Sequence, residues 1–335
     1  MEARSSYALV FPGQGSQRVG MARALAARYP AASTVFAVAD EALGEPLSRL
    51  AWDGPAEILD LTLNAQPALL TASIAYLRAL EGARAAAGLG ALQPRFYAGH
   101  SMGQYSALVA AGALGLGDAV RLVRERGRLM QVSGGEGAMA ALIGLDEASL
   151  PAVLEAGRQS GMVGVANRNA PGQIVISGLR PAVEAAIEAA KTAGARRAVL
   201  LPVSVAAHSP LMAEAAQAME AAVARVTFDD PTAPLLANAD ARPLTTAAAC
   251  RTELLDHLTT GVDWIATVTA MTAAGVRTFV EVGPGRVLTG LGKRIAPDAT
   301  WIALDDPSAP ADLADPDLGG GVESPPAAQP TLERA

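Results

Sequence analysis

The chain has 335 residues, of which 51% are hydrophobic and 18% charged, and its formal net charge at pH 7 is −7. This composition can build a large buried core, excludes an intrinsically disordered protein, and disfavours a nucleic-acid binder, which usually has a basic domain. The sequence has no run of about 18 apolar residues, and its N-terminus lacks the apolar segment of a secretory signal. We therefore expect a cytoplasmic protein with no membrane span and no nucleic-acid partner. The single cysteine, Cys250, excludes an internal disulfide and a cysteine-based zinc site.

The first 134 residues alternate between strand-like and helix-like segments. Residues 7–11 (YALVF) are a short apolar run followed by Pro12 and Gly13, which predicts a buried strand. The further predicted elements are helices at 20–28, 65–80, 104–111 and 118–132, and a short strand at 95–98. Because strands alternate with helices, this part of the sequence predicts a parallel α/β core.

The middle of the chain follows a different order. The pattern predicts a strand, a helix, two strands, a helix and a strand, at residues 138–145, 147–157, 163–167, 173–177, 181–193 and 197–203. This βαββαβ order is that of a split ferredoxin-like unit. We expect residues 135–204 to form such a subdomain, inserted into a larger body made of residues 1–134 and 205–304.

The last part of the chain returns to the body and then changes character. A helix at 263–274 and a strand at 278–282 follow the α/β pattern. From 305 to 335 the sequence is dominated by Pro, Asp, Gly and Ala, and little in it could pack against a core. This composition predicts a disordered tail.

The clearest chemical signal is GHSMG at residues 99–103, which matches G-x-S-x-G, the nucleophile elbow. Such an elbow needs a strand before it, a helix after it and small residues beside the serine, and the predicted neighbours meet all three conditions. The turn exposes the Ser101 hydroxyl at the start of a helix and points the main-chain N–H of Met102 at a developing oxyanion. The alternative is a structural glycine turn, because the motif also occurs by chance.

A serine nucleophile needs a base, and the chain has three histidines. His208 follows a strand-like run and precedes a helix start, which makes it a candidate general base, although a core or capping histidine fits equally well. We interpret His100, beside the serine, as structural and His257 as part of a solvated helix face. No carboxylate between Ser101 and His208 stands at a recognisable strand end, so no triad acid is assigned. A main-chain carbonyl can orient an imidazole instead.

A second glycine-rich loop, FPGQGSQ at 11–17, follows the first predicted strand. It fails the dinucleotide motif G-x-G-x-x-G because Arg18 stands at the third glycine position, and no P-loop motif is present. The alternative is that this loop supplies a second main-chain N–H to the oxyanion. We expect no cofactor, and the scattered histidines offer no ligand spacing for a metal.

Seven segments together resemble the malonyl-CoA:acyl-carrier-protein transacylases, which are close kin of polyketide-synthase acyltransferase domains. The segments are FPGQGSQ (11–17), NAQPAL (64–69), GHSMGQYSALVAAG (99–112), LVRERGRLMQ (122–131), GAMAALIGL (137–145), APGQIVISG (170–178) and VEVGPGRVLTGLGKRI (280–295). The resemblance covers about residues 7–300. It implies an α/β-hydrolase-like, parallel-sheet body with an inserted ferredoxin-like subdomain. It also implies an acyl-carrier-protein S-malonyltransferase of fatty acid or polyketide biosynthesis.

The resemblance implies a catalytic role for several residues. Ser101 would be the acylated nucleophile, and His208 would be the general base and acid. The main-chain amides of Gln14 and Met102 would form the oxyanion hole. Asp263 falls where the family offers a main-chain carbonyl to the histidine, so its own carboxylate would not be a triad acid.

The resemblance also implies how the substrates are held. Arg126 would pair with the malonyl carboxylate, whereas without the family register it would be one of several arginines on a solvated helix face. Gln66 would line the pocket, and Asn169 would shape it near the subdomain junction. The substrates would be malonyl-CoA and holo acyl carrier protein, and the protein is expected to be a monomer.

Two residues depart from the family pattern. Gln104 stands where the family often has Glu, and Ala207 stands where it often has Phe immediately before the histidine. A methyl group in place of an aromatic ring leaves room for an alkyl-branched malonyl group. Two alternatives therefore stay open: a stand-alone polyketide acyltransferase for a branched malonyl unit, and an acyl hydrolase acting on acyl carrier protein. A non-catalytic scaffold that docks the carrier protein is disfavoured by the intact Ser–His pair.

Overall fold

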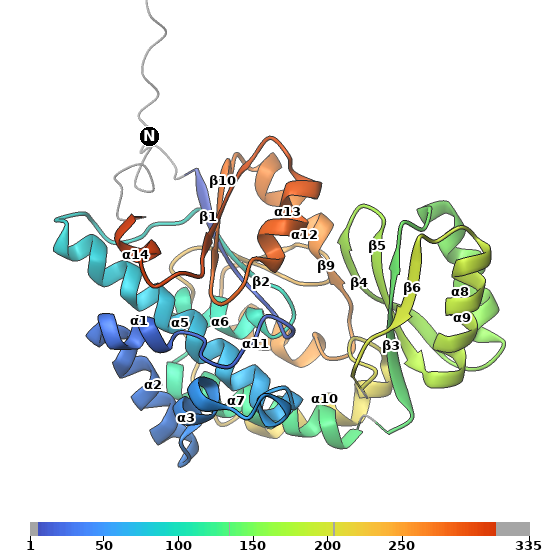
Figure 1. Cartoon of the computed structure of the whole chain (residues 1–335), viewed down its shortest axis with the longest axis horizontal. Helices are drawn as coiled ribbons and strands as arrows, with labels where there is room; N and C mark the ends of the chain where they lie inside the picture. The colour runs from blue at the N-terminus through green and yellow to red at the C-terminus, as the bar shows by residue number, and fades with distance from the viewer. Residues whose placement is uncertain (1–5, 134, 204, 313–335) are drawn as a thin grey trace, which may run out of the picture.

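Two β-sheets organise the chain in the computed structural model, which describes residues 6–133, 135–203 and 205–312 (Figure 1). The larger sheet lies in the body of the molecule, with α12 (Trp264–Ala273) and α13 (Val287–Ile295) on one side and α5 (Thr62–Ala86) on the other. The smaller sheet lies at one end of the molecule. The fold is therefore mixed α/β, as the sequence predicts.

The remaining elements span the described parts of the chain. The strands are β1 (Tyr7–Phe11), β2 (Phe96–Gly99), β3 (Gly137–Ile143), β4 (Val163–Ala170), β5 (Gln173–Leu179), β6 (Arg197–Leu200), β7 (Leu235–Leu236), β8 (Pro243–Leu244), β9 (Val262–Asp263), β10 (Thr278–Val282) and β11 (Thr300–Leu304). The other helices are α1 (Arg23–Arg28), α2 (Pro30–Leu43), α3 (Leu47–Asp53), α4 (Ala56–Leu59), α6 (Gly103–Ala110), α7 (Leu116–Ser133), α8 (Leu150–Arg158), α9 (Arg180–Thr192), α10 (Ala213–Val223), α11 (Ala247–Asp256) and α14 (Ala309–Asp312), with 3₁₀ turns at Glu147–Ser149 and Pro210–Met212.

The larger sheet has the strand order β11-β10-β1-β2-β7-β8. β1 pairs in parallel with both β10 and β2, and all five of its residues are buried, as expected for a strand covered on both faces. Phe11, at the end of β1, pairs with Gly99, at the end of β2. The two glycine-rich loops therefore leave the sheet side by side, because parallel strands end at the same edge.

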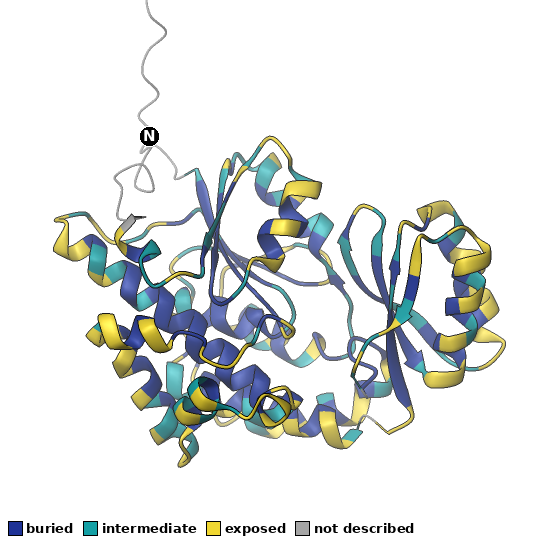
Figure 2. Cartoon of the chain, viewed as in Figure 1, coloured by how far each residue is buried: buried dark blue, intermediate teal, exposed yellow. Residues whose placement is uncertain are grey.

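The body has a large apolar core between the sheet and its helices. α5 is buried along most of its length, and Figure 2 shows this helix as dark blue against the yellow, exposed faces of the outer helices. A helix that is apolar nearly all round has to lie inside a core. The position of α5 brings its residue Gln66 next to α7, which packs against α5.

The smaller sheet has the order β6-β3-β5-β4-β9. β3 pairs antiparallel with β5 and β6, and β5 pairs antiparallel with β4. The predicted βαββαβ order of this segment is confirmed, and α8 and α9 pack against each other over a separate apolar core. The fifth strand, β9, comes from the body and pairs in parallel with β4. This pairing attaches the smaller sheet directly beside the body.

The predicted start of the tail at residue 305 is too early. Tyr76 donates a hydrogen bond from its hydroxyl to the carbonyl oxygen of Asp305 at 2.8 Å, and α14 packs against α5. These contacts give residues 305–312 a place on the body, whereas 313–335 lie outside the described residues. Within the described ranges, no helix is long and apolar enough to cross a membrane.

Candidate active site

The GHSMG segment forms a tight turn between β2 and α6. Ser101 has a φ of 51°, in the left-handed region that costs energy for a residue with a side chain. A Cβ on Gly99 would lie 2.0 Å from the main-chain carbon of Gly103, and one on Gly103 would lie 2.3 Å from the Phe11 carbonyl oxygen. Only glycine fits at these two positions, because the turn presses against itself and against β1. The predicted nucleophile elbow has the geometry that its motif requires.

Ser101 and His208 lie in direct contact, although 107 residues separate them. Ser101 Oγ is 2.8 Å from His208 Nε2. On the other side of the ring, Nδ1 is 2.9 Å from the carbonyl oxygens of both His257 and Thr260. Because carbonyl oxygens only accept hydrogen bonds, Nδ1 carries the proton, and Nε2 is free to accept the proton of the serine hydroxyl.

Two expectations about the surroundings of His208 are corrected by the structure. Asp263 does not supply the orienting carbonyl: its carbonyl oxygen accepts the Thr267 hydroxyl, and its carboxylate caps the start of α12. His257 is not on a solvated face but is 1% exposed, and its carbonyl is one of the two that orient His208. The orienting carbonyls therefore come from the segment that follows α11.

Of the two expected oxyanion amides, that of Met102 belongs to the elbow itself and that of Gln14 to the neighbouring glycine-rich loop. A Cβ on Gly13 would lie 2.6 Å from the His100 carbonyl oxygen, so the loop that carries Gln14 abuts the elbow. Met102 immediately precedes α6. Neither the Gln14 nor the Met102 main-chain N–H has an acceptor among the described residues. Both amides are therefore available to an oxyanion.

Arg126 is buried beside the serine. Its side chain is 1% exposed, and it donates to Gln66 Oε1 at 2.7 Å and to Ser101 Oγ at 3.3 Å. Its Nε has no acceptor, and no carboxylate of the described residues forms an ion pair with it. By contrast, Arg121 and Arg128 on the same helix are exposed and paired with acidic neighbours. A buried cation without a counter-ion fits an anionic ligand.

The electrostatic environment keeps His208 in its neutral form. Burial of the imidazole, and next the positive charge of Arg126, lower the pKa of His208 to about 3. Burial also lowers the pKa of Arg126 to about 10, which leaves the guanidinium charged at neutral pH. The imidazole is therefore unprotonated at neutral pH, which leaves its Nε2 open to the proton of the serine hydroxyl.

The remaining predicted residue, Asn169, contacts the elbow indirectly. Its Oδ1 is 2.8 Å from Nε2 of His100, whose ring also meets the edge of Trp264. Asn169 belongs to β4 of the smaller sheet, so this contact joins the two sheets at the elbow. The structure thus brings Ser101 together with His208 and Arg126, whereas Asn169 contacts the elbow through the side chain of His100.

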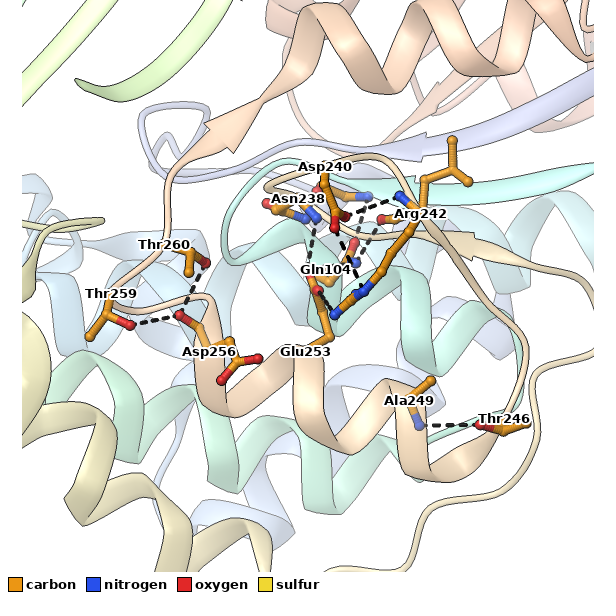
Figure 3. Close-up of polar contacts among 12 residues, drawn as sticks. Gln104, Asn238, Asp240, Arg242, Thr246, Ala249, Glu253, Asp256, Thr259 and Thr260 are labelled. Atoms are coloured by element: carbon orange, nitrogen blue, oxygen red, sulfur yellow. Dashed lines mark hydrogen bonds and ion pairs between the residues drawn. The ribbon is translucent and has the colours of Figure 1, made fainter.

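Sequence reasoning missed a buried polar cluster behind the elbow, which consists of Gln104, Asn238 and Glu253 (Figure 3). Asn238 Oδ1 accepts the main-chain N–H of Ser101 at 2.8 Å, and Asn238 Nδ2 donates to the Gly99 carbonyl at 3.0 Å. No motif marks Asn238 or Glu253, because both lie more than 130 residues from the elbow in the sequence. Within the described ranges, no group of His, Cys, Asp and Glu side chains could hold a metal ion.

These features define a class of protein: an α/β protein with a serine at a nucleophile elbow and a histidine oriented against it, a pair that suits acyl transfer. The sequence matches the model of the acyl transferase domain family over residues 8–299. The chain belongs to this acyl transferase family.

Individual relatives and solved structures give more specific matches than the family model. The chain is 48% identical over 309 residues to the malonyl CoA-acyl carrier protein transacylase of Escherichia coli strain K12, covering 92% of this chain and 98% of the relative. The acyl-carrier-protein S-malonyltransferase structure from Bartonella henselae has a TM-score of 0.89 at 44% identity and covers 94% of this chain and 100% of that one. A malonyl-transacylase solved in complex with its type II polyketide acyl-carrier protein has a TM-score of 0.85 at 42% identity, covering 92% and 99%.

Proposed function

We propose that the chain transfers the malonyl group of malonyl-CoA to the phosphopantetheine thiol of acyl carrier protein, through a malonyl ester on Ser101. Family membership and the malonyl transacylases among its relatives support the reaction. The observation that supports malonyl as the acyl group is the environment of Arg126. This buried cation lies 3.3 Å from Ser101 Oγ and has no acidic partner in the described parts of the chain. In a malonyl thioester the carboxylate is one methylene away from the carbonyl that the serine attacks. A group held by Arg126 therefore has its thioester beside Ser101.

The residues give each step a donor or an acceptor. Ser101 Oγ attacks the thioester carbonyl carbon while its proton passes to His208 Nε2. The negative oxygen of the tetrahedral intermediate accepts hydrogen bonds from the main-chain amides of Gln14 and Met102. The carbon–sulfur bond then breaks, and His208 returns the proton to the CoA thiolate. The carrier-protein thiol enters, gives its proton to His208, and the same steps run in reverse to release Ser101.

Arg126, Gln66 and Asn169 have supporting roles in this proposal. Arg126 binds the malonyl carboxylate through two N–H groups, which is the arrangement that guanidinium and carboxylate groups favour. Gln66 holds one nitrogen of Arg126 in place, and Asn169 fixes His100 beside the elbow. These groups and the two substrates account for the transfer, so we propose no cofactor. The cytoplasmic location stays a prediction.

We also propose the finer description of the fold. The parallel strands around β1 and the elbow after β2 support an α/β-hydrolase-like body. The antiparallel order β6-β3-β5-β4 supports a ferredoxin-like subdomain at residues 135–204, inserted between 1–134 and 205–304. The apolar core beneath α8 and α9 is separate from the two apolar cores that lie mainly in the body, and this fits the division.

The test is a transfer assay with purified chain, holo acyl carrier protein and a panel of malonyl-, methylmalonyl- and acetyl-CoA, in which the acylated carrier protein is followed by intact mass. We expect malonyl transfer to have the highest kcat/KM, with little free malonate. Preferred transfer of methylmalonyl would favour a polyketide acyltransferase for branched units. Release of free acid without acylated carrier protein would contradict the proposal and identify a hydrolase.

A further inference from the structure

The side chain of Asn238 binds the main chain of the elbow at two points, Gly99 and Ser101. Its Oδ1 accepts the N–H of Ser101 at 2.8 Å, and its Nδ2 donates to the carbonyl oxygen of Gly99 at 3.0 Å. Asn238 follows β7 and is 3% exposed, so water does not compete for these bonds. Because Ser101 has a φ of 51°, the turn is strained and needs such fixed partners to persist.

Asn238 is in turn held by a buried carboxylate. Glu253, on α11, accepts the main-chain N–H of Asn238 on Oε1 at 2.7 Å and is only 4% exposed. On the solvent side of the cluster, a guanidinium nitrogen of Arg242 lies 3.6 Å from the other carboxylate oxygen of Glu253. Gln104 completes the cluster: its Oε1 accepts the Gly99 N–H at 3.1 Å, and its Nε2 donates to the Leu236 carbonyl at 2.9 Å. Figure 3 shows these side chains converging between α6 and α11.

The same helix also leads to the base. His257, the first residue after α11, offers its carbonyl to His208 Nδ1 at 2.9 Å. The last turn of α11 therefore reaches the nucleophile through Glu253 and Asn238, and the residue that follows the helix reaches the base. The contacts of α11 and of the residue after it thus reach both members of the Ser101–His208 pair, and hydrogen-bond strength depends steeply on the distance between those two.

From this arrangement we propose that Asn238 and Glu253 are positioning residues for the acyl-transfer reaction. Asn238 clamps the elbow in its left-handed conformation, which directs Ser101 Oγ at His208 and the Met102 amide at the oxyanion. Glu253 fixes Asn238 from α11 and so couples the nucleophile to the carbonyl that orients the base. Neither side chain bonds to Arg126 or Gln66, so the clamp makes no direct contact with the groups proposed to hold the malonyl carboxylate. The inference rests on the proposed role of Ser101 as nucleophile.

Two rates separate positioning from a general role in folding. The first is kcat for malonyl transfer, compared with KM for malonyl-CoA. The second is the rate at which a small fluorophosphonate labels Ser101, because this probe carries no carboxylate and does not use Arg126. For Asn238→Ala we expect both kcat and the labelling rate to fall roughly tenfold to a hundredfold, as for loss of buried hydrogen bonds, with KM within about threefold.

The Glu253 variants test the coupling and replace Asn238→Ala if that variant does not fold. Glu253→Gln keeps an oxygen acceptor for the Asn238 N–H and should retain kcat within about threefold, whereas Glu253→Ala should lose roughly tenfold or more. The matched control is Thr246→Ala, which removes the side chain that caps the start of the same helix at 3.2 Å from the Ala249 nitrogen and lies away from the elbow. It should lower Tm and leave both rates unchanged.

The outcomes distinguish this inference from the proposed function. If the fluorophosphonate and malonyl-CoA leave Ser101 of the wild-type chain unmodified, the proposed function fails. If Ser101 is modified but a folded Asn238→Ala reacts at the wild-type rate, the clamp is refuted. It is also refuted if Glu253→Gln and Glu253→Ala lose equal activity, or if Thr246→Ala loses as much as Asn238→Ala.

Discussion

Replacing Arg126 by Ala should change the choice between malonyl and acetyl groups. In the structure the guanidinium is 1% exposed, and its Nε has no acceptor in the described residues. A malonyl carboxylate bound there is removed from water, and the loss of its partner leaves that charge buried and unpaired. Breaking such a pair costs about 2–5 kcal/mol, which corresponds to roughly 30- to 5,000-fold in kcat/KM.

The acetyl group has no carboxylate and so loses no charge pair when Arg126 is removed, and any effect of the substitution on Ser101 or His208 is common to both substrates. The assay is therefore the ratio of kcat/KM for malonyl-CoA to that for acetyl-CoA, with holo acyl carrier protein as the acceptor. We expect this ratio to fall at least about 30-fold in Arg126→Ala. Arg128→Ala is the matched control, because Arg128 lies on the same helix but is exposed and paired with Glu125. An unchanged ratio in Arg126→Ala would refute the assignment of Arg126 to the carboxylate.

Three further predictions concern the buried histidines. Arg126→Ala should raise the pKa of His208 above about 3, because the positive charge is the second cause of its lowering; an NMR titration that shows no rise would contradict this. His257→Gln keeps the carbonyl that orients His208 and should retain transfer activity, and loss of activity in a folded variant would show that the imidazole itself is needed. Burial lowers the pKa of His257 well below its usual value, so the unfolded chain binds its proton first and stability falls as the pH drops below about 6.5. The stability lost between pH 7 and pH 5, measured by urea unfolding, should be smaller in His257→Gln by about 2 kcal/mol, and an equal loss would contradict this reasoning.

The parts of the fold that the sequence predicts have a local signature. The apolar run of β1 and the strand-turn-helix around Ser101 need only short-range periodicity and glycine spacing, and both lie within a residue or so of their predicted places. No helix is predicted directly after residues 20–28, but Pro30 begins α2, because proline is well tolerated in a first helical turn. Strands of two residues, such as β7 and β9, are too short to show any period.

The same distinction holds for the candidate site: a residue in a local motif could be predicted, and residues joined only by tertiary contacts could not. Ser101 follows from its motif, whereas Arg126 is told apart from its exposed neighbours only by the family register, and its burial supports that choice. His257 was misread because charged residues precede it, while tertiary packing buries its side chain. Asn238 and Glu253 act through contacts between residues far apart in the chain, which no local pattern in one sequence records.

The central claim is that Ser101 carries the malonyl group during transfer. The most direct measurement is to mix the chain with malonyl-CoA in the absence of carrier protein, quench, and locate the adduct by intact mass and peptide mapping. The wild-type chain should gain one malonyl group on the peptide that contains Ser101 and release it when holo acyl carrier protein is added. Ser101→Ala should gain none. An equal adduct on Ser101→Ala, or transfer by the wild-type chain with no acylated Ser101 peptide, would contradict the claim.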